Sequence, residues 1–500
     1  MKKGDKRKAD FGILAVIVLF LLNGCQSEGT NKVTLTASYV VDSIEMPEGL
    51  SGEVGALEFM PDGRLIASFR RGEVMIFNGV ENKWTVFARG LHLPLGLLPL
   101  SNSEVLVMQY PELTRLKDTD GDGKADIYEK VTDDFGIAGN YHEFTYGPVR
   151  DQSGDIFIGL NSTSSGGEMM KEVRGEIKME GFREKGMYSA VPYRGWIMKL
   201  SRDGKLEPYA TGFRSPNGLG FDKEGHLLVT DNQGDWVGTS PLFQVEKGKF
   251  YGHPAGLVWQ EGWDKGKPAE LPVEVLDSMR EKPVVLFPHN VMANSPTQPL
   301  SIDTDGAFGP FEGQILVGEM NQERIVRVML EEVDGQLQGA CVPFLDKQGL
   351  RKGNNRLAFA PDGSLWVGQN ASGWAGASGI QRIRFTGKLP LDIETMQIRK
   401  EGFGIRFTKP VDPEVLKNPD NYLINSYYYE YHAKYGSEQF DKKEIGIKNV
   451  EVLKAGREVN IELDIMEKDR VYEWQLKNMV SEDGDTLRNS LICYTVNHLK

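Results

Sequence analysis

The sequence predicts an all-β protein, in which a six-bladed β-propeller is followed by a C-terminal immunoglobulin-like β-sandwich. The first observation is a repeat: an apolar run, a turn of the Asp-Gly type and a second apolar run occur six times. Strand repeats with irregular spacing and long inserts are typical of propeller blades rather than of a solenoid. The alternative, a pair of β-sandwiches, repeats weakly if at all. The copies are residues 56–69, 95–109, 146–161, 219–229, 300–319 and 357–370.

Composition is the second observation. A chain of 500 residues with 40% hydrophobic residues and 57 glycines suits a large, turn-rich β protein with an ample core. Second hairpins at 194–200 and 324–330 complete blades of about four strands each. We therefore expect the propeller over residues 42–390.

The fourth copy predicts where a site lies. Its two apolar strands, 219–221 and 227–229, are joined by a polar turn with glycine where the chain reverses. The residues that flank this hairpin are polar or charged: Arg214, Ser215 and Asn217 before it, Asp231 and Asn232 after it. Because the hairpin turns at its other end, these side chains are expected on one rim of the propeller, where loops line a site.

From residue 391 the repeat is no longer found, and short alternating stretches follow. They predict the immunoglobulin-like sandwich over residues 391–500, a size that folds alone. Its tyrosine run, 427–431, is either a carbohydrate-contacting face or a set of half-buried strand side chains.

The N-terminus has the pattern of an export signal. Residues 1–8 are basic and residues 11–22 are apolar, a run too short to span a bilayer. The four residues that end at Cys25 resemble the bacterial lipobox, which implies a lipoprotein signal peptide over 1–24 and a lipidated cysteine and tether over 25–41. We expect a protein of the cell envelope, held at the outer membrane by its lipid alone. The alternative is an ordinary secretory signal with a chance cysteine.

Charge and cysteine content exclude several classes of protein. The net charge is −13, which argues against nucleic acid as a partner. Besides Cys25, the chain contains Cys341 and Cys493, which the domain prediction places in different domains. They form no disulfide framework, no zinc ribbon and no attachment motif for c-type haem.

Residues 118–129 carry a specific local signal. They fit the twelve-residue calcium loop, with oxygens at positions 1, 3, 5 and 9, glycine at 6 and glutamate at 12. Alternating carboxylates wrap inward around the ion, and the glycine aims the next backbone carbonyl at it. We expect a structural Ca²⁺ site here; the alternative is a solvated acidic turn. The expected ligands are Asp118, Asp120, Asp122, the carbonyl of Lys124, Asp126 and Glu129.

Three loop histidines are candidates for a site. His142, His253 and His289 lie next to glycine, proline or asparagine, in loops between expected strands. A histidine near neutral pKa can act as a general base. A loop histidine is more often an ordinary surface residue, so spacing alone does not assign it a role.

Three stretches carry a resemblance to a known family. They are Tyr141-His142 before a hairpin, the motif at 212–219 that contains Arg214 and Asn217, and the Tyr-Gly-His-Pro motif at 251–254. Over about residues 45–387 the chain resembles the soluble quinoprotein glucose and sorbosone dehydrogenases. Residues 95–98, 113–123 and 251–257 resemble the membrane-bound dehydrogenase branch of that family.

The resemblance implies a role for each matching residue. In the family, a histidine at the position of His142 takes the hydroxyl proton of a sugar while hydride passes to pyrroloquinoline quinone (PQQ). An arginine at the position of Arg214 holds the quinone, and Ca²⁺ bridges the cofactor to the protein. The candidate catalytic residues are thus His142 and Arg214, and the candidate cofactor-binding residues are Arg214, Asn217, Tyr251, His253 and His289.

Three functions remain open from the sequence. The first is a lipid-anchored, PQQ-dependent dehydrogenase that oxidises a sugar or related alcohol and passes electrons to a separate acceptor such as a c-type cytochrome. The second is a metal-dependent lactonase of the gluconolactonase type. The third is a non-catalytic, glycan-binding lipoprotein. The lactonase would use the set Glu58, Asn161, Asn217 and Asp231.

Overall fold

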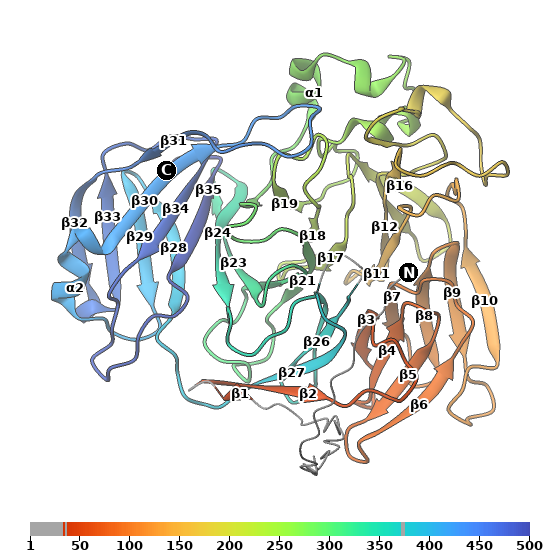
Figure 1. The fold of residues 1–500 in the computed structure, drawn as a ribbon, viewed down its shortest axis with the longest axis horizontal. Coiled ribbons are helices and arrows are strands. Elements are labelled where there is room, and N and C mark those ends of the chain that lie inside the picture. Colours follow the sequence, from red (N-terminus) through yellow and green to blue (C-terminus); the bar gives the residue numbers. More distant parts are fainter. Residues whose placement is uncertain (1–33, 36–37, 372–375) are drawn as a thin grey trace, which may run out of the picture. The chain divides into compact units, whose positions relative to one another are not determined.

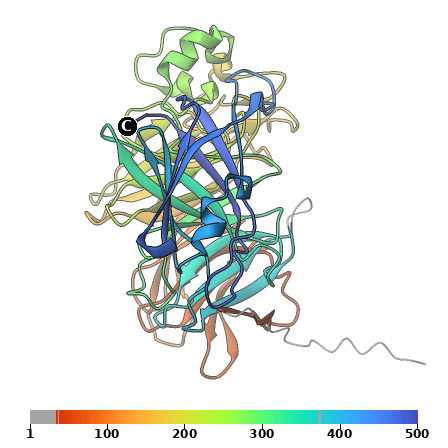
Figure 2. The same ribbon diagram turned by 90° about the vertical axis from the view of Figure 1, so that its left-hand side faces the viewer.

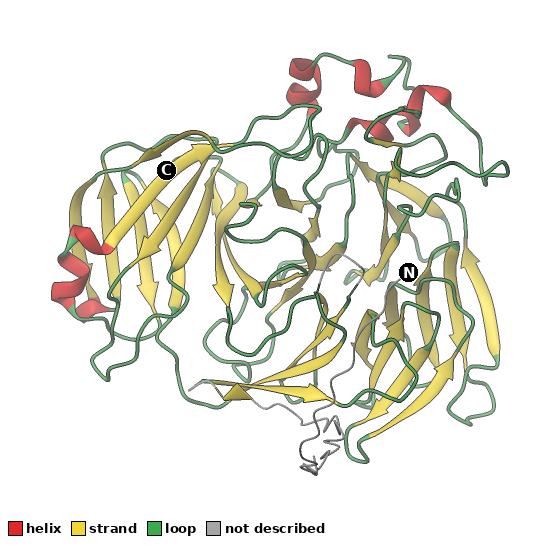
Figure 3. Cartoon of the chain, in the orientation of Figure 1, coloured by secondary structure: helices red, strands yellow, loops and turns green. Residues whose placement is uncertain are grey.

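The computed structural model describes residues 34–35, 38–371 and 376–500, and the protein is nearly all β. Helical turns are confined to inserts and connections (Figure 3). Among the residues described, no helix is long and apolar enough to cross a bilayer. The expected signal peptide over 1–24 and Cys25 lie outside the described residues. The helices are η1 (Met179–Gly181), η2 (Pro254–Trp259), η3 (Pro268–Glu270), α1 (Val273–Met279), α2 (Pro413–Lys417), η4 (Pro419–Asn421) and η5 (Lys454–Gly456).

Six antiparallel units follow one another along the chain (Figure 1), and each begins with one of the six predicted hairpins. The first three are β3 (Val54–Phe59), β4 (Leu65–Phe69), β5 (Val74–Asn78) and β6 (Lys83–Ala88); β7 (Gly96–Pro99), β8 (Glu104–Gln109), β9 (Glu112–Lys117) and β10 (Ile127–Thr132); and β11 (Thr145–Arg150), β12 (Ile156–Leu160), β15 (Trp196–Leu200) and β16 (Leu206–Thr211). A small ribbon, β13 (Thr163–Ser164) and β14 (Met187–Tyr188), lies in the insert of the third unit.

The next three units have the same order from first strand to last. They are β17 (Gly218–Phe221), β18 (Leu227–Thr230), β19 (Ser240–Gln244) and β20 (Val285–Phe287); β21 (Pro296–Ser301), β22 (Ile315–Glu319), β23 (Ile325–Val333) and β24 (Gln336–Phe344); and β25 (Asn354–Phe359), β26 (Leu365–Gln369), β27 (Gly379–Phe385) and β2 (Tyr39–Ile44), with β1 (Thr34–Leu35) outside β2.

The first strands of the six units form a closed ring. β3, β7, β11, β17, β21 and β25 contact one another in that order, and β25 contacts β3 again. The sixth unit takes its fourth strand from the other end of the chain, because β2 pairs with β27 from Tyr39 opposite Phe385. Residues 39–41, which were expected to belong to the tether over 25–41, are thus part of β2 in the sixth unit.

Glycines let the strands of the ring approach closely. A Cβ added to Gly96 would lie 1.2 Å from the carbonyl oxygen of Gly147, and one added to Gly218 would lie 2.3 Å from that of Thr297. Such distances leave no room for any side chain. The glycines that open the second and fourth hairpins are thus required by packing between neighbouring units.

The C-terminal strands form two sheets, blue in Figure 2. One contains β28 (Ile393–Arg399), β29 (Gly402–Phe407), β33 (Glu458–Leu463) and β32 (Ile447–Leu453). The other contains β31 (Phe440–Glu444), β30 (Tyr422–Tyr428), β34 (Arg470–Leu476) and β35 (Leu491–Val496). Side chains of both sheets share one core, in which the ring of Phe403 lies 5.4 Å from Trp474 and 5.0 Å from Tyr494.

The fifth unit and the C-terminal region share one continuous sheet, because β24 pairs with β35. In that pairing Cys341 lies directly opposite Cys493, and both thiols are free and buried. The sequence suggested two cysteines far apart in separate domains; strand pairing instead makes them neighbours. A buried ion pair strengthens the same junction, since Arg327 Nη2 lies 2.9 Å from Asp392 Oδ1.

We expect Gly96→Ala to lower the free energy of unfolding by about 3 kcal/mol or more, the upper end of the cost of overpacking. The new methyl would meet backbone atoms of Gly147 and Pro148 rather than a movable side chain. Urea denaturation measures the change. Gly79→Ala is the matched control, because the nearest atom to its Cβ is 3.8 Å away, and it should change stability by less than about 0.5 kcal/mol. Equal stability of the two variants would contradict the close packing of the ring.

Candidate functional site

A cavity of about 790 Å³ lies at one end of the ring of first strands. Its walls come from the segments that precede the first strand or follow the second strand of successive units, which is the rim that the sequence predicts. Its lining includes Arg70, Tyr141, His142, Arg214, Ser215, Asn217, Asn232, His289, Asn294, Ser295, Asn355, Asn370 and Tyr435.

Four of the six predicted catalytic and cofactor-binding residues meet in this cavity. His142 enters from the loop before β11, Arg214 and Asn217 from the loop before β17, and His289 from the loop after β20. These residues are separated by up to 147 positions in the chain, so the ring of units alone brings them together. His289 is half-buried, and its Nδ1 is buried with no hydrogen-bond partner.

His142 is held in one tautomer. Its Nδ1 lies 3.2 Å from the carbonyl oxygen of Ser162, which can only accept a hydrogen bond, so Nδ1 carries the proton. Nε2 is then the nitrogen with a free lone pair. Burial, together with the positive charge of Arg214, lowers the pKa of His142 to about 4. The imidazole is therefore neutral at pH 7 and able to accept a proton.

A buried ion pair supports the His142 loop from behind. Glu143 is fully buried, and its Oε1 lies 3.9 Å from Arg194 Nε, which is also fully buried. Glu143 also accepts hydrogen bonds from the Ala138 backbone (2.8 Å) and from Thr163 Oγ1 (2.6 Å). Because every oxygen of this carboxylate has a donor, the backbone next to His142 is fixed in position.

Two carboxylates position Arg214. Asp231 is buried and accepts the backbone N–H of Arg214 (2.7 Å) and of Ser215 (2.6 Å), which fixes the loop before β17. Asp235 Oδ1 lies 3.6 Å from Arg214 Nε, and this Nε is buried without a hydrogen-bond partner. Arg214 is thus oriented by its neighbours, and its side chain lines the cavity.

The charge of Asp235 is secured by its surroundings. Burial acts to raise the pKa of this carboxyl, but His253, the Met187 N–H and Arg214 outweigh it and lower the pKa well below the ordinary range. Arg183 Nη1 also lies 2.8 Å from Asp235 Oδ2. Asp235 therefore stays ionised and keeps its place beside Arg214 over the whole neutral range.

A second buried arginine lies beneath the cavity. Arg356 Nη1 donates to Asn217 Oδ1 (3.3 Å) and to Asn355 Oδ1 (3.0 Å), and Nη2 donates to the carbonyl of Leu95 (3.2 Å). No carboxylate of the described residues forms an ion pair with it. Burial lowers the pKa of Arg356 to about 10, so it remains cationic at pH 7.

The charged side chains that line the cavity are cationic although the chain is acidic, and each has a carboxylate partner outside the lining, since Arg70 Nη1 lies 3.7 Å from Glu53 Oε1 and Arg214 Nε lies 3.6 Å from Asp235 Oδ1. Within the described part of the chain, its lining includes Arg70 and Arg214 but no aspartate or glutamate. The nearby carboxylates lie behind the wall, where backbone N–H groups occupy their oxygens; Glu319 Oε1, for instance, accepts from Asn294 (2.9 Å) and Ser295 (3.1 Å). A cavity with cations, amides and no acid suits an anionic ligand.

Tyr251 and His253 do not line the cavity, contrary to their predicted cofactor contact. The Tyr251 ring is buried and stacks on Phe213 at 5.1 Å. His253 is fully buried, with Nε2 3.5 Å from Asp235 Oδ2. The glycine-rich loop turns both side chains into the protein, so His253 acts on the site only through Asp235 and Arg214.

The predicted calcium loop lies away from the cavity. It joins β9 to β10, at the end of the second unit opposite to the rim, and the Asp118 N–H donates to the Ser103 carbonyl in the neighbouring turn (2.9 Å). Acidic oxygens of Asp118, Asp120 and Asp126 lie within 4.8 Å of one another. An ion held here would not touch a ligand in the cavity, so the cofactor bridge implied by the resemblance is not made by this loop.

Two other expected ligands of that loop have different partners. Glu129 Oε2 lies 2.9 Å from Lys117 Nζ, and Asp122 Oδ2 lies 3.5 Å from Lys124 Nζ. The carbonyl of Lys124 belongs to the same turn, which is held by hydrogen bonds from its own backbone to Asp118 and Asp122. Three of the five expected carboxylate ligands, those of Asp118, Asp120 and Asp126, therefore lie close enough together to hold one cation.

The residues of the lactonase alternative do not share one metal site. Glu58 faces the narrow channel inside the ring, and burial raises its pKa to about 8, so it is protonated at pH 7. Asp231 is occupied by backbone N–H groups, and Asn161 donates to Ser215 Oγ (3.0 Å). Of this set, only Asn217 lines the cavity.

Sequence reasoning missed several residues of the cavity. Asn370 occupies the position after the second strand of its unit, as Asp231 and Asn232 do in theirs, so the repeat itself contained this signal. Arg356 and Asn355 lie within β25, the first strand of the sixth unit, where the repeat gives no signal of a cavity residue. Tyr435 comes from the C-terminal region, and nothing in the local sequence connects it with the rim.

Comparison with known proteins gives the following. Residues 76–260 match the model of a family described as a domain of unknown function, DUF7133. No curated protein sequence matches the chain. Among solved structures, it is similar to an oxidoreductase candidate (glucose dehydrogenase) from Thermus thermophilus, at 19% identity over 69% of this chain and 99% of that one, with a TM-score of 0.47.

Two further structures extend over the same part of the chain. The PQQ-bound aldose sugar dehydrogenase from Streptomyces coelicolor is 17% identical, over 70% of this chain and 99% of that one, with a TM-score of 0.45. A gluconolactonase candidate is 13% identical, over 71% of this chain and 94% of that one, with a TM-score of 0.39. At this level of similarity, function has to be argued from the side chains of the site.

We expect Arg214→Gln to raise the pKa of His142 from about 4 toward its ordinary value of 6.5, without reaching it, because burial still disfavours the charged ring. Loss of the positive neighbour makes protonation easier, so the neutral fraction at pH 5 should fall. NMR titration of the imidazole in the ligand-free protein measures this. Arg64→Gln, a change of a partly exposed residue outside the cavity, is the control, and an unchanged pKa in Arg214→Gln would contradict the electrostatic coupling.

Proposed function

We propose that this protein is a dehydrogenase of the quinoprotein type, which oxidises a sugar or related alcohol and passes the electrons to a separate acceptor such as a c-type cytochrome. The observation that carries the proposal is the cavity: a neutral histidine with a free Nε2 faces an acid-free wall that contains Arg70 and Arg214. A base and fixed cations in one enclosed space are what removal of a hydroxyl proton and binding of an anionic quinone require.

The residues present fit pyrroloquinoline quinone. This cofactor is a planar ring system with three carboxylates, and a cavity of about 790 Å³ is in the size range of sites for such ligands. The Arg214 side chain lines this cavity. With Arg70, Asn217 and Asn355 it would supply charged and amide donors to the carboxylates and to the quinone oxygens.

Each residue of the site has its own role in the proposed reaction. When bound, the quinone supplies a two-electron acceptor for hydride from the substrate carbon. His142 Nε2 accepts the hydroxyl proton, and the Nδ1 hydrogen bond to Ser162 keeps the ring in the correct tautomer. Arg214, held by Asp235, stabilises negative charge on the oxygens beside it. Asp231 keeps the Arg214 loop in place without entering the cavity.

The fold proposal goes with this function. We propose that the closed ring of six units is a six-bladed β-propeller over about 39–390, and that the two sheets after residue 391 form an immunoglobulin-like sandwich. We also propose that the chain is a lipoprotein of the cell envelope, anchored through Cys25 at the outer membrane. Support comes from the ring of first strands, the closing strand β2 and the lipobox-like residues before Cys25.

For the calcium loop we propose a structural role. Added Ca²⁺ should raise the melting temperature, since an ion that binds only the folded state at 100 times its Kd adds about 2.7 kcal/mol. Asp118→Asn should abolish the rise, because both oxygens of this residue organise the loop. Glu224→Gln, in an acidic turn elsewhere, is the control. A rise that survives Asp118→Asn would place the ion elsewhere.

The main test is a titration of the soluble chain, residues 26–500, with PQQ, followed by absorbance and by reduction of a dye with a panel of sugars. We expect saturable PQQ binding and sugar-dependent reduction only when PQQ is present. Arg214→Ala should weaken PQQ binding at least about tenfold, the effect of losing one charge-assisted contact. His142→Ala should retain PQQ binding but lower the rate by about 10²–10⁴-fold.

Three outcomes separate the alternatives. Release of acid from a lactone without any electron acceptor would favour the lactonase, and sugar binding without reaction would favour the glycan-binding lipoprotein. A protein that does not bind PQQ is not the proposed quinoprotein.

A further inference from the structure

We propose that the C-terminal region completes the substrate site, and that Tyr435 together with Tyr141 forms the surface on which a sugar ring binds. The proposal rests on the proposed function for the identity of the substrate. Its structural basis is independent: Tyr435, in a loop of the C-terminal region over residues 429–438, lines the cavity. Substrate choice would then depend on residues outside the ring of six units.

The loop is joined to the fourth unit by its backbone. Tyr435 forms an isolated antiparallel bridge with Asp235. Next to it, the Gly436 N–H donates to the Gly234 carbonyl (2.9 Å) and the Ser437 N–H donates to the Gly238 carbonyl (2.8 Å). Asp235 is also the carboxylate that orients Arg214, so the position of Tyr435 is coupled directly to the centre of the site.

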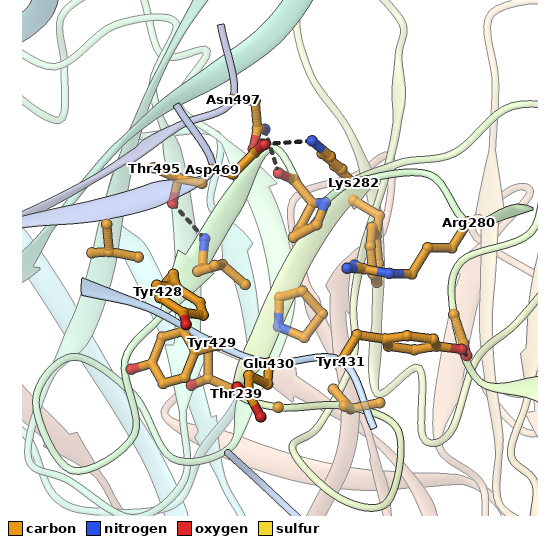
Figure 4. A pocket seen from close by; sticks show the side chains of 18 of the residues that line it. Thr239, Arg280, Lys282, Tyr428, Tyr429, Glu430, Tyr431, Asp469, Thr495 and Asn497 are labelled. Atoms are coloured by element: carbon orange, nitrogen blue, oxygen red, sulfur yellow. Dashed lines mark hydrogen bonds and ion pairs between the residues drawn. The ribbon is translucent and has the colours of Figure 1, made fainter. Parts of the chain in front are cut away.

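Aromatic contacts hold the base of the loop. Figure 4 shows Tyr431 beside Arg280 in the pocket where the C-terminal region meets the fourth unit. The guanidinium of Arg280 lies 4.5 Å from the Tyr431 ring centroid, and the Trp236 ring lies at 5.3 Å. The Tyr431 hydroxyl donates to the Gly252 carbonyl. The tyrosine run is therefore an anchor at this junction, and the loop beyond it is held in place when no ligand is bound.

Tyr435 itself is exposed. Its side chain is 69% accessible, and its ring centroid lies 5.6 Å from the guanidinium carbon of Arg214. Tyr141, next to His142 in the chain, is 63% accessible and lines the same cavity. Three aromatic side chains among the described residues are exposed, these two and, to a lesser degree, Tyr128 on β10 (47%), so two of the three are in one cavity.

Exposed tyrosines at the lining of a polar cavity suit a sugar. A tyrosine ring offers a flat apolar face to the C–H face of a pyranose, while its hydroxyl stays hydrated. Tyr141 is adjacent to the proposed base, and Tyr435 covers the proposed quinone-holding arginine. A ring bound between them would lie beside both groups that the reaction uses.

The test is calorimetric titration of the full soluble chain with D-glucose, D-galactose, D-xylose and maltose, each with and without PQQ. Tyr435→Ala and Tyr141→Ala should each weaken binding of whichever sugar the wild type binds by about 2- to 10-fold, the effect of one aromatic contact. PQQ affinity should change less than sugar affinity. Tyr435→Phe should keep sugar binding, because the ring face carries the contact.

Tyr128→Ala removes an exposed tyrosine outside the cavity and is the matched control. Melting temperatures show whether each variant is folded. If the wild type binds a sugar without binding PQQ and Tyr435→Ala loses it, the inference stands although the quinoprotein function fails. If PQQ binds but no sugar of the panel does, or if Tyr435→Ala binds sugar like the wild type, the inference is wrong, while PQQ binding itself still supports a quinoprotein, in the first case one that acts on another alcohol.

Discussion

The close approach of the six first strands is the constraint on which the rest of the structure depends. Where Gly96 meets Gly147 and Gly218 meets Thr297, backbone lies against backbone with no space for a Cβ. The channel inside the ring is accordingly narrow, about 30 Å³ in volume, and the wide cavity forms only at the rim, where the loops diverge. Tight packing of the first strands thus closes the floor of the cavity, where the buried Arg356 donates a hydrogen bond to Asn217.

Charge in the site is arranged in layers. Arginines and amides face the cavity, whereas Asp231, Asp235 and Glu319 lie behind them and accept backbone N–H groups. A carboxylate satisfied by backbone donors stays where the fold puts it and can orient an arginine without neutralising the space in front of it. This arrangement lets a chain with a net charge of −13 line the cavity with cationic and amide side chains, while burial, together with the charge of Arg214, lowers the pKa of His142.

The C-terminal region is more than an appended domain. Its strand β35 continues the sheet of the fifth unit, the Arg327–Asp392 pair is buried at the junction, and its loop 429–438 reaches the cavity. The first two of these contacts involve desolvated groups, whose separation would leave buried polar atoms unpaired. The two parts of the chain are therefore expected to unfold and to bind ligand as a coupled system.

The sequence by itself determined the features that depend on residues close together in the chain. Period-two apolar runs and turn glycines specified the six hairpins, and the reversal of each hairpin put residues such as Arg214 and Asp231 on one rim. Only the tertiary structure decided which loop residues face the cavity, because packing turned His253 inward and left His142 in the lining. It also decided contacts between segments that are far apart in the chain. Cys341 lies opposite Cys493 because two strands pair across 152 positions, and Tyr435 reaches Arg214 because a loop crosses from one sheet to another. Neither contact leaves a local pattern in the sequence that could predict it.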